Sequence, residues 1–95
     1  MENYQLKLSA QRALLGEISN NVKAVAVNVK NNILEILVYF FKNPNSDDKD
    51  SYNFVTGEIL ADFPKEITDI KYNFIVWDGK SSFSTIKNLV FLRKD

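Results

Sequence analysis

Carboxylates are the first side chains to consider for chemistry in this 95-residue chain, because the sequence contains neither His nor Cys. Asp47, Asp48 and Asp50 form its one local concentration of acids. Their oxygens could bind a hard cation such as Ca²⁺ or Mg²⁺, but the Gly and the terminal Glu of an EF-hand loop are missing. Acids at this position are typical of the first turn of a helix, where their negative charge interacts favourably with the positive end of the helix dipole. A partner-binding patch and a metal site are the remaining alternatives.

A second pair of carboxylates, Glu58 and Asp62, lies one helical turn apart. Such a pair could in principle work as the acid and base of a glycosidase, but those groups usually come from different elements. A solvated helix face explains the pair better. The three Gly residues are scattered, so the chain has no glycine-rich phosphate loop. We therefore expect no enzyme, with no catalytic residue, no metal site and no cofactor.

Composition limits the class of protein further. Twelve basic and twelve acidic side chains give a formal net charge of zero, which argues against a nucleic-acid partner. A hydrophobic fraction of 45% is ample for one packed domain over residues 1–95. The longest apolar run, 36–41, is far shorter than the ~20 residues of a membrane span, and the first residues do not form a signal peptide. We expect a cytoplasmic protein with no membrane partner.

Hydrophobic periodicity predicts six elements. Ser9 precedes a run of strong helix formers and is a suitable N-cap. Asn31 and Asn32 suit a two-residue hairpin turn, which places residues whose numbers sum to 63 opposite each other. Pro64 ends the second helix. The predicted elements are a helix over about 9–18, strands over 22–30 and 33–41, a helix over about 47–62, and strands over 68–77 and 89–92.

The order of these elements is helix-strand-strand-helix-strand-strand. Strands that follow each other in pairs favour antiparallel pairing. The sequence therefore predicts a single α+β domain, in which a four-stranded antiparallel sheet carries both helices on one face.

An aromatic sheet face, defined by Leu37, Tyr39 and Phe41, should lie on the side of the sheet opposite the helices. Polar residues would be expected there. One explanation is that the N-terminal segment 4–8 or the loop 80–88 covers this face, or that Ala24 and Ala26 leave little room for exposure. The other is that the face binds a protein partner or a second copy of the chain, since aromatic side chains are common in interface hot spots.

Two stretches resemble a known family. They are Tyr4-Gln-Leu-Lys-Leu-Ser-Ala-Gln-Arg-Ala-Leu-Leu-Gly16 and Thr56-Gly-Glu-Ile-Leu-Ala-Asp-Phe-Pro64, about a quarter of the chain. They are similar to small bacterial immunity proteins of contact-dependent growth inhibition and related toxin systems. The resemblance implies an inhibitor that binds the C-terminal toxin domain made by the same cell, commonly a nuclease.

A nuclease carries a basic cleft, so its inhibitor should present complementary carboxylates. We expect the partner-binding residues to be acids along one edge of the second helix, together with the aromatic sheet face. The alternative function is a homodimeric structural or regulatory protein that associates through the aromatic sheet face. The predicted contact residues are Asp47, Asp48, Asp50, Glu58, Asp62, Leu37, Tyr39 and Phe41.

Overall fold

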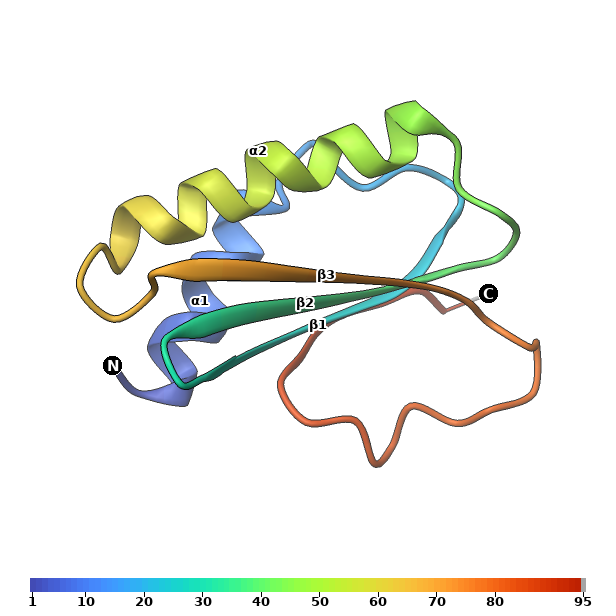
Figure 1. The fold of residues 1–95 in the computed structure, drawn as a ribbon. Helices are drawn as coiled ribbons and strands as arrows, with labels where there is room; N and C mark the ends of the chain where they lie inside the picture. Colours follow the sequence, from blue (N-terminus) through green and yellow to red (C-terminus); the bar gives the residue numbers. More distant parts are fainter. Residues whose placement is uncertain (95) are drawn as a thin grey trace.

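The computed structural model describes residues 1–94 as two helices and a four-stranded sheet (Figure 1). The elements are α1 (Asn3–Ala13), β1 (Val22–Lys30), β2 (Ile33–Phe40), α2 (Ser46–Asp62), β3 (Asp69–Val76) and β4 (Leu89–Leu92). Their order confirms the prediction. Among the described residues, neither helix is long and apolar enough to cross a membrane.

The sheet is mixed rather than antiparallel. Its strand order is β3-β2-β1-β4, and β1 runs antiparallel to both of its neighbours. However, β2 and β3 pair in parallel, so the all-antiparallel prediction was wrong at this pairing. The physical reason is α2, which carries the chain back along the length of the sheet, so that β3 starts at the same end as β2 (Figure 1). Neighbouring parallel strands need such a crossover.

The β1–β2 hairpin turns at Asn31 and Asn32, whose φ angles are 54° and 64°. Both positive values suit the type I′ turn, which matches the twist of the flanking strands. The predicted register is confirmed over most of the hairpin. At its far end an irregularity in β1 places Val22 opposite Phe40 instead of Phe41.

Helix α1 begins earlier than predicted. Glu2 is its N-cap, and Glu2 N–H donates a 2.8 Å hydrogen bond to Gln5 Oε1 as part of a capping box. The capping box satisfies backbone groups that otherwise lack helical partners, so the helix needs no cap at Ser9. Instead, Ser9 is buried, and its hydroxyl donates a 2.6 Å hydrogen bond to Asp62. The predicted range 9–18 was therefore wrong at both ends.

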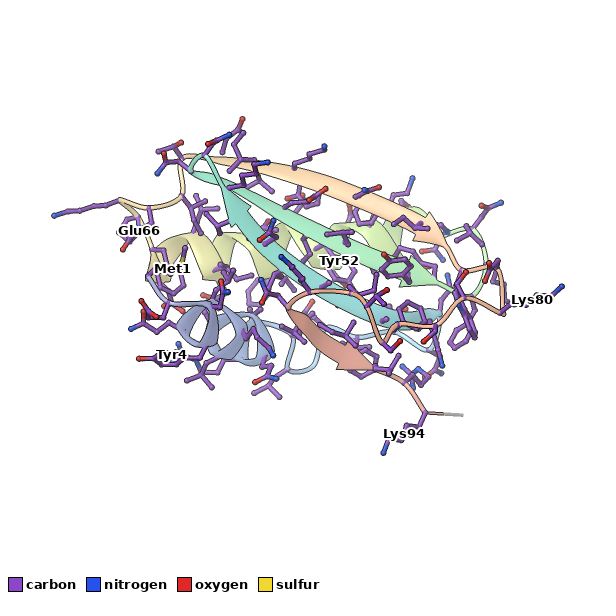
Figure 2. All side chains as sticks on the ribbon, turned by 90° about the horizontal axis from the view of Figure 1, so that it is seen from below. Met1, Tyr4, Tyr52, Glu66, Lys80 and Lys94 are labelled. Carbon is purple, nitrogen blue, oxygen red and sulfur yellow. The ribbon has the colours of Figure 1, made fainter. Side chains whose placement is uncertain are left out.

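The core lies between the helices and one face of the sheet. Figure 2 shows the sheet from the opposite side, with α2 behind it. Side chains from both helices pack in one cluster with the same face of β1 and β2, which confirms that both helices lie on one face. The fully buried members include Leu6, Ala10, Val25, Val27, Leu34, Ile36, Val38, Tyr52, Val55 and Ile59.

Tyr52 carries an unsatisfied hydroxyl in this core. Its ring packs edge-on against Phe40, with centroids 6.4 Å apart, but its buried oxygen has no hydrogen-bond partner among the described residues. Burial, and then the charges of Asp48 and Glu17, raise the pKa of Tyr52. The hydroxyl therefore stays neutral and costs about 1–3 kcal/mol of desolvation that no hydrogen bond offsets.

We expect Tyr52→Phe to raise the free energy of unfolding by about 1 kcal/mol in urea denaturation, because it keeps the ring and removes the unsatisfied group. The matched control is Tyr72→Phe, since the Tyr72 hydroxyl donates a 2.9 Å hydrogen bond to Asn53 Oδ1 and lies 2.8 Å from Thr56 Oγ1. This control should lose about 0.5–1 kcal/mol. A loss of stability in Tyr52→Phe would contradict the interpretation.

Candidate functional site

The outward face of α2 carries an exposed aromatic ring among acids. Asp47, Asp50, Phe54 and Glu58 are all exposed, and their spacing of three, four and four residues places them on one side of the helix. The Phe54 side chain is 54% exposed. We call these four residues the acidic α2 face.

Phe54 was missed by the sequence analysis. The buried stripe of α2 consists of Tyr52, Val55, Thr56 and Ile59, and it accounts for the helical periodicity without Phe54. Two residues from Tyr52 correspond to about 200° around the helix, so Phe54 points away from the core. A large apolar residue out of phase with the buried stripe is the signal that could have found it.

Asp48, in contrast, is hydrogen-bonded to other segments of the chain. Its carboxylate accepts hydrogen bonds from Asn45 N–H at 3.1 Å, Ser19 Oγ at 2.9 Å and Asn21 Nδ2 at 3.2 Å. Partial burial raises the pKa of Asp48, but these hydrogen bonds outweigh it and leave the pKa below its usual value. The stabilisation is therefore present at neutral pH and is lost as the pH falls through the folded-state pKa. Asp48 anchors the start of α2.

Asp62 anchors the other end of α2 to α1. Besides the bond from Ser9, its Oδ2 atom lies 3.2 Å from Arg12 Nη2. A small hollow of about 180 Å³ lies between the helices here, lined by Ser9, Arg12, Ala13, Glu58 and Asp62. The structure thus divides the five predicted acids: Asp47, Asp50 and Glu58 share the acidic α2 face, whereas Asp48 and Asp62 bind neighbouring segments. Among the described residues, no group of acids is arranged to hold a metal ion.

A loop covers the aromatic sheet face. The segment 77–88 runs below the sheet in Figure 1, on the side opposite α2. The Phe83 ring is buried and meets Tyr39 edge-on, with centroids 5.0 Å apart, and Trp77 lies 6.0 Å from Phe41. Leu37, Tyr39 and Phe41 are only partly exposed. Of the explanations for this face, the ring contact supports cover by the 80–88 loop, while segment 4–8 belongs to α1.

Polar contacts secure this loop. The Lys23 ammonium lies 4.7 Å from the Trp77 ring centroid and donates a 2.7 Å hydrogen bond to the Arg93 carbonyl. Asp78 accepts hydrogen bonds from the Ser81 hydroxyl and from the N–H groups of Ser81 and Lys80. These bonds, led by the Ser81 hydroxyl, lower the pKa of Asp78 to about 2. The loop is thus held at two places. Asp78 fixes its first residues, and the Phe83 ring packs against Tyr39 in its middle.

Comparison with known proteins supports the immunity-protein resemblance. The family model described as MafI2 immunity protein matches residues 3–95, nearly the whole chain. No curated protein matches the sequence. The match covers α1, the acidic α2 face and the complete sheet. The chain therefore belongs to the MafI2 immunity protein family.

Proposed function

We propose that this protein neutralises a bacterial toxin by binding it through the acidic α2 face, without chemistry of its own. The observation that carries the proposal is Phe54, a large ring that is more than half exposed among three acids on one helix. Membership of an immunity-protein family supports a toxin as the partner. We expect the complex to form in the cytoplasm.

The composition of this face suits a protein interface. Aromatic side chains act as anchors that fill a pocket on the partner, and surrounding polar groups exclude water from the contact. The carboxylates of Asp47, Asp50 and Glu58 add attraction to a basic surface. A nuclease toxin of a contact-dependent growth inhibition system would present such a surface, because its cleft must bind an anionic nucleic acid.

The helix is held rigidly enough to present these groups in one geometry. Asn45 and Asp48 form a capping box at its start, and Asp62 ties its last turn to α1. Between these points, Val55 and Ile59 are fully buried in the core. Binding through a preorganised helix loses little conformational entropy, which favours tight association.

Co-expression is the direct test of the function. The protein is produced together with the toxic domain encoded beside its gene, and cell survival and co-purification are scored. Survival with a stable complex is the expected result. Cell death at full expression of the folded protein would contradict the proposal.

Charge reversal tests the surface. We expect Asp47→Lys with Asp50→Lys to slow association with the toxin by about 10- to 100-fold at low salt, because exposed charges mainly steer the encounter. The measurement is the association rate by stopped-flow or biosensor, repeated as the salt concentration rises. The difference from the native protein should shrink with salt.

The control is Glu66→Lys with Asp69→Lys, which makes the same change in net charge. Glu66 lies in the turn before β3, and Asp69 is the first residue of β3. Neither of these acids belongs to the acidic α2 face. We expect association to slow less than threefold. If both double variants slow association equally, net charge and not the acidic α2 face attracts the toxin.

A further inference from the structure

The first turns of α2 are not held by the hydrophobic core. None of residues 46–51 is fully buried, and the buried stripe of the helix begins only at Tyr52. Two members of the acidic α2 face, Asp47 and Asp50, belong to this unpacked start, whereas Phe54 lies in the packed part of the helix. Helix ends without packing fray readily. Polar contacts must therefore determine where Asp47 and Asp50 lie.

These contacts come from the segment 19–21, which precedes β1. The Ser19 hydroxyl donates a 2.9 Å hydrogen bond to Asp48 Oδ1, and Asn21 Nδ2 donates a 3.2 Å bond to Asp48 Oδ2. The Asn21 side chain is itself fixed, because it donates a 3.0 Å bond to the Lys42 carbonyl and accepts a 3.1 Å bond from Lys42 N–H. Figure 1 shows the segment that leads from α1 into β1 passing beside the start of α2. Asp48 is thus bound to residues far from it in the sequence.

Arg93, which directly follows β4, holds the other side of Ser19. Its Nη2 atom donates a 3.0 Å hydrogen bond to the Ser19 carbonyl, and its Nε atom donates a 2.9 Å bond to the Val22 carbonyl. The backbone of Arg93 is fixed as well, since its N–H donates a 2.9 Å bond to the Lys23 carbonyl. The guanidinium also lies 5.4 Å from the Phe91 ring centroid. Ser19 is therefore bound through its carbonyl to the end of β4 and through its hydroxyl to α2.

We infer that Ser19 and Arg93 are positioning residues for the acidic α2 face, whose first turns they fix through Asp48. Asp47 and Asp50 lie on either side of Asp48 in the sequence, so the same contacts set the geometry in which these two carboxylates meet the toxin. A helix start that is already ordered loses less conformational entropy when the toxin binds. The inference rests on the proposed function, because it gives these hydrogen bonds a role in toxin binding.

Hydrogen exchange of the free protein tests the link to α2 without the toxin. The Lys49 amide donates to the Asn45 carbonyl at the start of the helix, and we expect Ser19→Ala to speed its exchange by about tenfold. Ser19→Thr keeps the hydroxyl and should restore slow exchange. The matched control is Ser9→Ala, which removes a hydroxyl bonded to Asp62 at the other end of α2. This control should leave the Lys49 amide unchanged, and an unchanged Lys49 amide in Ser19→Ala overturns the inference.

Toxin binding tests the role of this link. We expect Ser19→Ala to weaken toxin affinity by about five- to tenfold. In a chain that already carries Asp47→Ala and Asp50→Ala, it should weaken binding no further, because the carboxylates that it positions are gone. In the Phe54→Ala background its effect should be retained. Equal effects in the native chain and in both backgrounds would indicate a general loss of stability and would overturn the inference.

Arg93→Lys separates geometry from charge. Lysine keeps the positive charge but cannot make both bonds from one planar group, so we expect about threefold faster exchange of the Lys49 amide and about threefold weaker toxin binding. Lys94→Gln, which removes a charge from the next residue, is the control and should behave as the native chain does. Native behaviour of Arg93→Lys would overturn the role of Arg93.

The two proposals fail in different ways. If Phe54→Ala weakens toxin binding and Ser19→Ala does not, the proposed function stands and the inference fails. If neither variant changes toxin affinity, the toxin binds elsewhere and both proposals fail.

Discussion

Phe54→Ala should weaken toxin binding by about 30- to 1,000-fold, which corresponds to the loss of one aromatic anchor at about 2–4 kcal/mol. The ring is more than half exposed on the acidic α2 face, so it contributes little to the core. We expect the free energy of unfolding to change by less than about 0.5 kcal/mol. Affinity is measured by calorimetry with the toxin domain, and stability by urea denaturation.

The control for this variant is Val76→Ala. Val76 is also exposed, at 45%, but it lies at the end of β3. Affinity for the toxin should stay within about threefold of the native value. Equal losses in the two variants, or an unchanged affinity in Phe54→Ala, would show that the toxin binds elsewhere.

Kinetics should separate the two parts of the acidic α2 face. Removing an anchor acts mainly on the dissociation rate, since it changes contacts that exist only in the complex. Reversing Asp47 and Asp50 acts mainly on the association rate and depends on salt. Phe54→Ala should therefore dissociate faster at every salt concentration. This contrast distinguishes a packed aromatic contact from a general attraction between opposite charges.

The fold was predictable where the determining interactions are local. The β1–β2 hairpin follows from alternating residues and from two Asn that tolerate positive φ. Parallel pairing of β2 with β3 was not predictable in the same way, because it depends on where α2 returns the chain to the sheet. The start of α1 was missed because Glu2 and Gln5 form the cap, while Ser9 looked like a better one.

The candidate site was predictable only as a set of acids. The sequence placed them on one helix, but it could not show which of them bind other segments. Asp48 is held by Ser19 and Asn21, and Asp62 by Ser9; all three partners are distant in the sequence. Such contacts require the tertiary structure. Phe54, in contrast, could have been predicted from the sequence. The positions of the buried residues of α2 place Phe54 on the solvent-facing side of the helix.

The loop over the aromatic sheet face gives the largest expected effect on stability. Phe83 is 9% exposed, and its ring lies 5.0 Å from Tyr39 and 5.8 Å from Trp77. Replacing a buried Phe with Ala costs about 3–5 kcal/mol through lost burial and the cavity that remains. Because this cluster lies at the surface and can partly collapse, we expect Phe83→Ala to lose about 3 kcal/mol.

Trp77 reports this change directly, since it is the only Trp in the chain. Loss of the Phe83 ring should expose the indole, so that the fluorescence emission of the folded variant shifts to longer wavelength. Ile86→Ala in the same loop, at a half-buried position, is the control and should shift the emission less. The acidic α2 face lies on the other side of the sheet (Figure 1), so toxin affinity should be retained. An unchanged emission would show that Phe83 does not hold the loop over the aromatic sheet face.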